Sequence, residues 1–179
     1  MLGSFADPEQ NIGHLELHPG MSVADFGAGA GAYSFASARR VGGTGHVYAV
    51  EVQKDLLEKL KREAKEKHIG TIEVVWGDLD VGGGSKLKDS SMDAVVISNV
   101  LFQSENRGAM IREAHRVLKP AGKVLYIEWS DSFKNLGPTQ AQVISEPSAR
   151  KMFEEAGFRV MPPFHAGAHH YGFIAKKTE

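Results

Sequence analysis

The sequence predicts a doubly wound α/β fold, in which a mostly parallel sheet carries helices on both faces. Strand-like and helix-like patterns alternate along the chain, as they do in sheets built from repeated strand-helix-strand units. A run of glycines joins the first of these strands to a helix, which is typical of ligand-binding turns in such sheets. The chain has 179 residues, 42% of them hydrophobic, and suits one domain spanning 1–179.

The order of the elements follows from the periodicity of the apolar residues. Strands are expected near 22–27, 46–51, 72–76, 93–98 and 123–129, with helices near 31–41, 53–68 and 106–119. Within the second helix, Leu56, Leu60 and Ala64 repeat on one face, while acid-base pairs such as Asp55 with Lys59 occupy the other. The last quarter predicts a helix near 146–156 and strands near 158–162 and 169–176.

The strongest functional signal is the glycine-rich turn after the first strand. Gly27, Gly29 and Gly31 allow a tight turn and a close approach of a ligand to the backbone. The helix that follows directs its free N–H groups toward an anionic group over the turn. Glu51 ends the second strand at a distance suited to holding the hydroxyls of a ribose, and Asp78 follows the third strand, where it suits an adenine amino group.

Two kinds of nucleotide cofactor fit these signals. Gly27, Gly29 and Ala32 match a dinucleotide fingerprint, so an NAD-dependent oxidoreductase is an alternative. Against it, the third glycine falls at Gly31, and neither a Tyr-x-x-x-Lys pair nor a separate substrate domain is found in the sequence. A protein that binds the cofactor without catalysing a reaction is a further alternative.

A later element of the sequence favours S-adenosylmethionine over NAD as the cofactor. Residues 113–123 read Glu-Ala-His-Arg-Val-Leu-Lys-Pro-Ala-Gly-Lys, a helix that runs through Leu-Lys-Pro-x-Gly into a strand. With this element the chain, from about Pro19 onward, resembles the class I S-adenosylmethionine-dependent methyltransferases. It is similar to small stand-alone members related to the ubiquinone/menaquinone-type and arsenite-type group.

The resemblance implies a Rossmann-like sheet of seven strands, with the antiparallel last strand inserted beside the fifth. It also implies S-adenosyl-L-methionine as the cofactor and a methyl acceptor as the substrate. The implied cofactor-binding residues are Asp25, Gly27, Ala28, Gly29, Gly31, Glu51, Val52, Asp78, Leu79 and Asn99.

Composition narrows the acceptor class. Without cysteine, thiolate catalysis, thiolate zinc sites and arsenite binding on cysteines are excluded. A net charge of -1 gives no general reason to bind nucleic acid or an anionic membrane. Ser98-Asn99-Val100-Leu101 stands where enzymes that methylate base amino groups carry Asn/Asp-Pro-Pro-aromatic, so a small-molecule acceptor is favoured. With neither a signal peptide nor a membrane span, a cytoplasmic protein is expected. The sequence does not indicate an oligomeric state.

The loop 162–171 is expected to overhang the acceptor site. It carries His165, His169 and His170, and a histidine there could remove a proton from an acceptor. A structural or surface role is favoured for any single one, and since His169 and His170 alternate faces, at most one of them points inward. No acid stands at a metal-ligand spacing, so no metal is expected. Glu128 is the other candidate base.

The ends of the fourth and fifth strands supply the remaining acceptor-side candidates. Asn99 is expected near the sulfonium, and Phe102, Gln103, Trp129 and Tyr171 are expected to contact the acceptor. For Phe102, core packing beneath the cofactor is an equal alternative.

Two further segments have expected roles near the cofactor. The N-terminal segment 1–18, with Phe5, Gln10 and His14, could fold over the cofactor as a lid. The glycine run 82–84 predicts a flexible loop near the adenine end.

Overall fold

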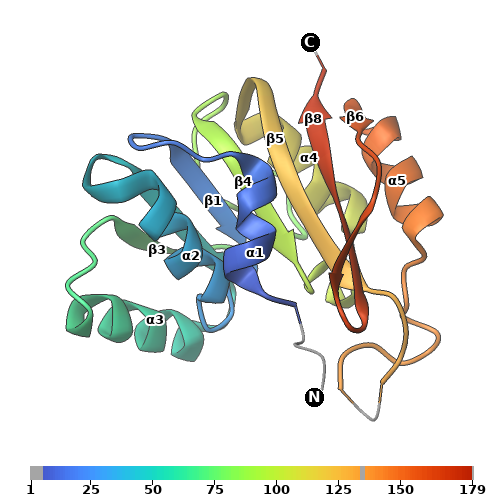
Figure 1. Ribbon diagram of the computed structural model, residues 1–179, viewed down its shortest axis with the longest axis horizontal. Coiled ribbons are helices and arrows are strands. Elements are labelled where there is room, and N and C mark those ends of the chain that lie inside the picture. The colour runs from blue at the N-terminus through green and yellow to red at the C-terminus, as the bar shows by residue number, and fades with distance from the viewer. Residues whose placement is uncertain (1–5, 134–135, 179) are drawn as a thin grey trace.

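The computed structural model describes residues 6–133 and 136–178, which form a three-layer α/β domain (Figure 1). Five strands run parallel in the order β3-β2-β1-β4-β5, and β8 and β6 complete the path beyond β5. β8 is antiparallel to both of its neighbours on that path. The predicted fold class, with its antiparallel last strand beside the fifth, is confirmed.

The bounds of the elements lie close to those expected. The strands are β1 (Ser22–Phe26), β2 (His46–Glu51), β3 (Ile72–Trp76), β4 (Met92–Ser98), β5 (Leu118–Trp129), β6 (Phe158–Val160), β7 (Phe164–Gly167) and β8 (His170–Lys177). The α-helices are α1 (Pro8–Ile12), α2 (Ala32–Val41), α3 (Lys54–Glu66), α4 (Arg107–Val117) and α5 (Glu146–Glu155). Short 3-10 helices cover Gly13–Leu15, Gly42–Thr44 and Leu101–Gln103.

Two elements differ from the expectation. β5 begins at Leu118 rather than near 123, because Leu118 already pairs with Met92 before an irregularity in the ladder. β7 lies inside the segment expected to be a loop and pairs with β8 outside the main path of the sheet. The main path therefore keeps the seven predicted strands, and β7 is an additional one.

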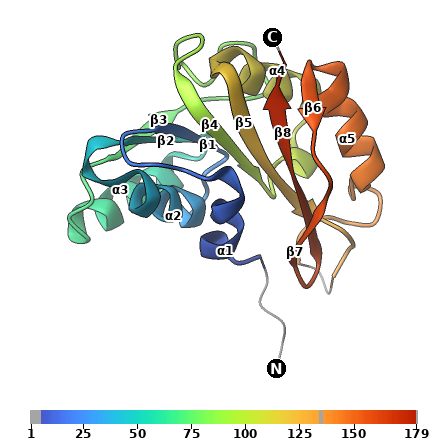
Figure 2. The ribbon, with the colours of Figure 1, turned by 45° about the horizontal axis from the view of Figure 1, so that its top comes forward.

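Helices cover both faces of the sheet. α1, α2 and α3 lie on one face, and α4 and α5 lie on the other (Figures 1 and 2). A hydrophobic core lies on each face of the sheet, and side chains of β1 pack into both. Val23 packs on the α1/α2 side, and Ala24 and Phe26 pack on the α4/α5 side. Asp25 shares the face of Val23, so its carboxylate lies toward α2.

The register brings the carboxyl ends of the parallel strands to one edge. Phe26 of β1 pairs with Val50 of β2 and with Ile97 of β4. The residues that follow these strands therefore lie beside one another, as ligand-binding residues do in open α/β sheets.

Candidate functional site

A cavity of about 530 Å³ lies at this carboxyl edge, within the usual size range of small-molecule sites. All the predicted cofactor residues except Gly31 line it: Asp25, Gly27, Ala28, Gly29, Glu51, Val52, Asp78, Leu79 and Asn99. Of the predicted acceptor residues, Gln103 lines it as well. Five segments far apart in the sequence thus meet at one hollow.

The three glycines of the turn serve different purposes. A Cβ atom on Gly27 would lie 2.4 Å from the Val100 side chain, and one on Gly31 would lie 2.7 Å from Leu60, so both are required for packing. A Cβ atom on Gly29 would meet no protein atom closer than 4.0 Å. Because Gly29 lines the cavity, its missing side chain leaves room there for a ligand.

Glu51 fixes the glycine turn and faces the cavity. One of its carboxylate oxygens accepts a hydrogen bond from the Gly29 N–H at 3.0 Å. The other accepts from the N–H groups of Val52 and Gln53, each at 2.9 Å. Its side chain is buried apart from its contribution to the cavity wall. A carboxylate held in this way retains lone pairs for the hydroxyls of a ribose.

Asp25 connects β1 to the first turn of α2. Its carboxylate accepts hydrogen bonds from the Ser34 hydroxyl, at 2.6 Å, and from the Ser34 backbone N–H. Burial raises the pKa of Asp25 to about 6, although the bonds from Ser34 oppose the rise. Asp25 therefore accepts hydrogen bonds from the first turn of α2 and also places a carboxyl group in the cavity wall.

Asn99 places an unused acceptor at the end of β4. Its backbone takes a left-handed conformation with φ of 55°, and its N–H donates to the Ile127 carbonyl at 3.0 Å. The Oδ1 atom of its side chain is buried and has no hydrogen-bond partner within residues 6–133 and 136–178. A buried acceptor without a donor is costly, so Asn99 fits a ligand that brings an N–H group.

Asp80 lines the cavity as well, although it was not predicted from the sequence. It accepts hydrogen bonds from the Ser104 hydroxyl and from the N–H groups of Glu105 and Asn106. Burial raises the pKa of Asp80, but these bonds outweigh that effect and leave the pKa below its ordinary value. The only available signal was its place two residues after Asp78, in the loop that follows a parallel strand.

The glycine run 82–84 makes defined contacts with its surroundings. A Cβ atom on Gly84 would lie 1.6 Å from the Asp78 carbonyl oxygen, so only glycine allows this contact. Glu113 of α4 accepts hydrogen bonds from the N–H groups of Gly83 and Ser85, and Arg116 donates to it at 2.7 Å. Burial raises the pKa of Glu113, but these bonds outweigh burial and hold the pKa at about 2.

The cavity wall is acidic. Among the residues that the structure describes, its lining includes Asp25, Glu51, Asp78 and Asp80 but no Lys, Arg or His. Such a wall attracts a cation and repels the two negative charges of a pyrophosphate. S-adenosylmethionine carries a sulfonium and an ammonium group, so the residues present fit it better than they fit NAD.

Glu128 lies beside this cavity but does not line it. Its buried carboxylate accepts hydrogen bonds from the N–H groups of Phe102, at 3.2 Å, and Trp129, at 3.1 Å, and from the Tyr126 hydroxyl at 3.5 Å. Burial raises the pKa of Glu128 to about 7. These contacts place Glu128 beneath the 3-10 helix Leu101–Gln103. Tyr171 lies close by and donates its hydroxyl to the Ile144 carbonyl at 2.8 Å.

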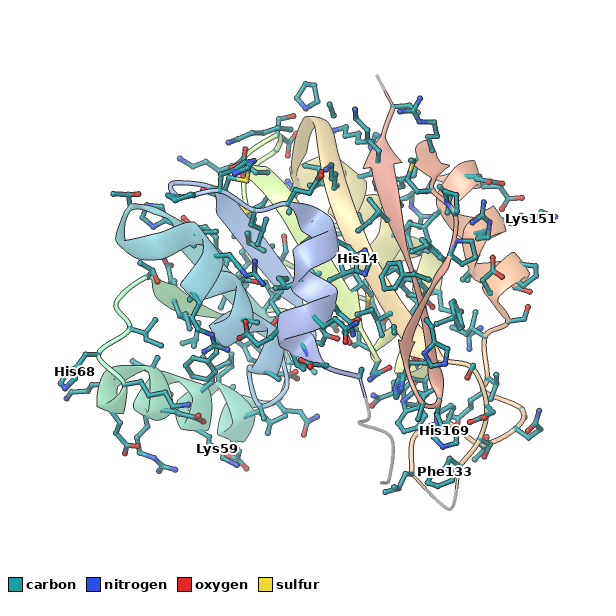
Figure 3. The ribbon with its side chains drawn as sticks, in the orientation of Figure 1. His14, Lys59, His68, Phe133, Lys151 and His169 are labelled. Carbon is teal, nitrogen blue, oxygen red and sulfur yellow. The ribbon has the colours of Figure 1, made fainter. Side chains whose placement is uncertain are left out.

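The three predicted histidines have different surroundings. His170 is buried, and its ring centroid lies 4.3 Å from that of Trp129. Neither of its ring nitrogens has a hydrogen-bond partner among the residues that the structure describes. Burial lowers the pKa of His170 to about 4, so the ring is neutral at physiological pH. His169 lies 3.0 Å from Asp131 and stacks on Phe133 (Figure 3). His165 is exposed.

Only one histidine of the 169–170 pair points inward, as predicted. Neither His165, His169 nor His170 lines the cavity, and the same holds for Phe102, Trp129 and Tyr171. Within residues 6–133 and 136–178, no group of three or more histidine or acidic side chains could hold a metal ion. None of the helices in this described part is long and apolar enough to cross a membrane.

The N-terminal segment approaches the cavity through a residue that was not predicted. Gln10 is exposed, and His14 stacks on Phe164 at 3.8 Å (Figure 3), so neither of these lid candidates lines the cavity. Phe5 lies outside the described residues. Instead, Asn11 of α1 donates to the hydroxyl of Tyr33, which does line the cavity.

Comparison with known proteins agrees with this geometry. Residues 17–158 match the family described as "Methyltransferase domain". The chain therefore belongs to this family, within the class I S-adenosylmethionine-dependent methyltransferases.

Three similar proteins illustrate the relationship. A crystal structure of a SAM-dependent methyltransferase from Aquifex aeolicus is 27% identical, with a TM-score of 0.86 over 96% of this chain and 90% of that one. An arsenite methyltransferase from Halobacterium salinarum is 28% identical over 60% of this chain and 27% of its own length. A ubiquinone/menaquinone biosynthesis C-methyltransferase from Paraburkholderia phymatum is 26% identical over 84% of this chain and 55% of its own length. The chain thus spans about half or less of these two curated relatives.

Proposed function

We propose that this protein transfers the methyl group of S-adenosylmethionine to a small-molecule acceptor. The observation that carries the proposal is the acidic cavity built around Gly29 at the carboxyl edge of the sheet, whose lining within the described residues includes no basic side chain. Family membership over residues 17–158 supports the same activity.

Different cavity residues would contact different parts of the cofactor. Glu51 would accept the hydroxyls of the ribose, and Asp78 and Leu79 would surround the adenine. Asp25 and the unpartnered Oδ1 of Asn99 would accept the ammonium group of the methionine part. Gly27, Ala28 and Val52 would complete the wall.

The mechanism needs orientation more than acid-base chemistry. The bound cofactor supplies a methyl group that is already activated by the positive sulfur. The chain's own task is to align an acceptor and exclude water. Gln103 lines the cavity. Phe102 precedes it in the same 3-10 helix, and Trp129, Tyr171 and His170 lie at the paired ends of β5 and β8, where we place the acceptor. Glu128, with a pKa of about 7, is the stronger base near this place, and the neutral ring of His170, with a pKa of about 4, is a weaker one, so Glu128 is our first candidate to take a proton from a hydroxyl acceptor.

The amino-acid composition limits which class of acceptor the protein can use. The chain has no cysteine, so arsenite cannot be held on thiolates. With a net charge of -1, binding to nucleic acid or to an anionic membrane has no electrostatic support, and a cytoplasmic enzyme is part of the proposal. An organic small molecule is the remaining class, as in the C-methyltransferases of quinone biosynthesis that the chain resembles.

Calorimetric titration tests the proposal. We expect micromolar binding of S-adenosylmethionine and S-adenosylhomocysteine and no binding of NADH. The Glu51→Ala variant should bind ten- to a hundredfold more weakly, because it loses hydrogen bonds to a charged group, each worth about 1.5–3 kcal/mol. Glu58→Ala, on the exposed face of α3, is the matched control. Binding of NADH alone would overturn the proposal in favour of an oxidoreductase. Tight cofactor binding with no product from a broad acceptor screen would favour a binding protein.

A further inference from the structure

Tyr33 is a cavity residue whose hydroxyl is held in a defined orientation. It stands in the first turn of α2, its side chain is buried, and it lines the cavity. Asp25 and Ser98, which line the cavity too, lie near enough to affect the pKa of its hydroxyl. Burial raises the pKa of Tyr33, so the phenol keeps its proton at physiological pH. A protonated phenol can donate one hydrogen bond and accept others.

Asn11 of α1 determines which of these roles the phenol plays. The side-chain amide nitrogen of Asn11 donates to the Tyr33 hydroxyl at 3.2 Å and to the Ala166 carbonyl of β7 at 2.9 Å. Asn11 is 2% exposed, and these two bonds use both of its amide hydrogens. The phenol oxygen of Tyr33 therefore accepts from Asn11, and its own proton is free to be donated.

On the cavity side, that proton meets a small polar neighbour. The Ser98 side chain, which also lines the cavity, lies near enough to the phenol to lower the pKa of Tyr33 against the larger effect of burial. The Ser98 hydroxyl can either donate or accept a hydrogen bond, and it can rotate away, so it does not commit the phenol proton of Tyr33. In the described structure the phenol is thus presented to the part of the cavity between β1 and β4.

The carboxylate of a bound S-adenosylmethionine needs donors in this part. The acidic side chains repel it, and the lining contains no basic side chain among the described residues to attract it. Resting on the proposed function, we propose that Tyr33 recognises the cofactor's carboxylate by donating its phenol proton, and that Asn11 is the positioning residue that keeps this proton directed into the cavity. The pair would select cofactors that carry a complete amino-acid end.

The test compares two ligands that differ by one group. S-adenosylmethionine and decarboxylated S-adenosylmethionine share the sulfonium, the adenosine and the ammonium, and only the first has the carboxylate. For Tyr33→Phe we expect the dissociation constant of S-adenosylmethionine, measured by calorimetry, to rise about tenfold. The constant for the decarboxylated ligand should stay within twofold. Phenylalanine keeps the ring packing, and thermal melting of the free variant checks that the fold is retained.

Asn11→Ala and the double variant test the positioning role. Asn11→Ala should weaken S-adenosylmethionine binding severalfold while sparing the decarboxylated ligand. If Asn11 acts through Tyr33, the double variant should bind no more weakly than Tyr33→Phe alone. Additive losses would overturn the role of Asn11.

Two other results separate the possible failures. An unchanged affinity of Tyr33→Phe for S-adenosylmethionine, or an equal loss with both ligands, would overturn the role of Tyr33 and leave the proposed function standing. Wild-type protein that binds neither S-adenosylmethionine nor S-adenosylhomocysteine would overturn the proposed function itself.

Discussion

A single glycine shows how a residue without a side chain can carry function. Gly27 and Gly31 are enclosed by Val100 and Leu60, whereas Gly29 borders the cavity. We predict that Gly29→Val abolishes measurable cofactor binding, because the side chain would occupy ligand space. The positive φ of 54° adds a strain of about 1–2 kcal/mol. Calorimetry and thermal melting separate the two effects.

The matched control for Gly29 is Gly43→Val. A Cβ atom on Gly43 meets no atom within 4 Å, and the residue lies away from the cavity lining. This variant should bind the cofactor like the wild type. Retained binding by Gly29→Val would show that the ligand does not lie over the turn.

Asp25 makes cofactor binding depend on pH. Its pKa of about 6 in the free protein lies above the ordinary 3.8, so the carboxyl is mostly protonated below pH 6. An ammonium group prefers the carboxylate, so we predict that S-adenosylmethionine binds more weakly as pH falls from 7 to 5, by up to about tenfold per unit. Calorimetry in two buffers of different ionisation enthalpy should detect proton release near pH 6.

The control for this pH dependence is an altered side chain at the same place. Asp25→Asn cannot titrate, so its affinity should be lower at pH 7 and nearly constant between pH 5 and 7. A wild-type affinity that does not change with pH would contradict an ammonium contact at Asp25.

At the scale of elements, one acid joins the loop after β3 to α4. Glu113 accepts from the loop N–H groups of Gly83 and Ser85 and from Arg116. The lowering of its pKa from 4.5 to about 2 corresponds to roughly 3 kcal/mol of preference for the charged form. We predict that Glu113→Gln lowers the free energy of unfolding by about 2–3 kcal/mol at pH 7, measured by urea denaturation.

The lowered pKa of Glu113 determines how the stability difference between the wild type and Glu113→Gln should change with pH. A depressed pKa contributes stability that is fully present above the unfolded value of 4.5 and is lost as pH falls toward 2. The difference between wild type and Glu113→Gln should therefore shrink between pH 5 and pH 3. Glu66→Gln, on the exposed side of α3, should show no difference at either pH. An equal deficit at pH 3 and pH 7 would show that packing, not charge, holds the loop.

The elements predicted from sequence are those set by local pattern. The glycine turn, the acid after β2 and the apolar stripe of α3 depend on spacing along a single segment, so the parallel sheet and the residues of its carboxyl edge could be placed from them. The antiparallel β8 came from the resemblance to known methyltransferases. β7 was missed because its pairing with β8 depends on a turn at 168–169 that carries no strong signal.

The contacts missed in the site are those between distant segments. Asn11 and Tyr33 are 22 residues apart and meet only because α1 packs on α2. Asp80 reaches Ser104 across the space between β3 and α4, and Glu113 reaches the glycine run in the same way. Local periodicity does not encode such side-chain pairs, so the contacts of Glu113 with the loop that contains 82–84 could not be predicted from the sequence.

At the scale of the whole molecule, charge is concentrated where it acts on the ligand. The net charge of the chain is only -1, yet the cavity wall carries Asp25, Glu51, Asp78 and Asp80 without a basic partner in the described lining. The methylated cofactor carries a positive sulfur, and the demethylated product does not. We therefore predict that the protein binds S-adenosylmethionine more tightly than S-adenosylhomocysteine, by roughly three- to tenfold at low ionic strength.

Salt identifies the origin of this preference. Raising the ionic strength from about 0.05 M to 0.5 M shortens the screening length to a few ångströms, so the sulfonium should lose more of its attraction than the neutral thioether. The ratio of the two dissociation constants, measured by calorimetry, should fall toward one. Asp80→Asn, which removes one acid from the wall, should reduce the ratio at low salt and weaken its salt dependence. A ratio that does not respond to salt would mean that contacts of the methyl group, rather than the acidic wall, distinguish the substrate from the product.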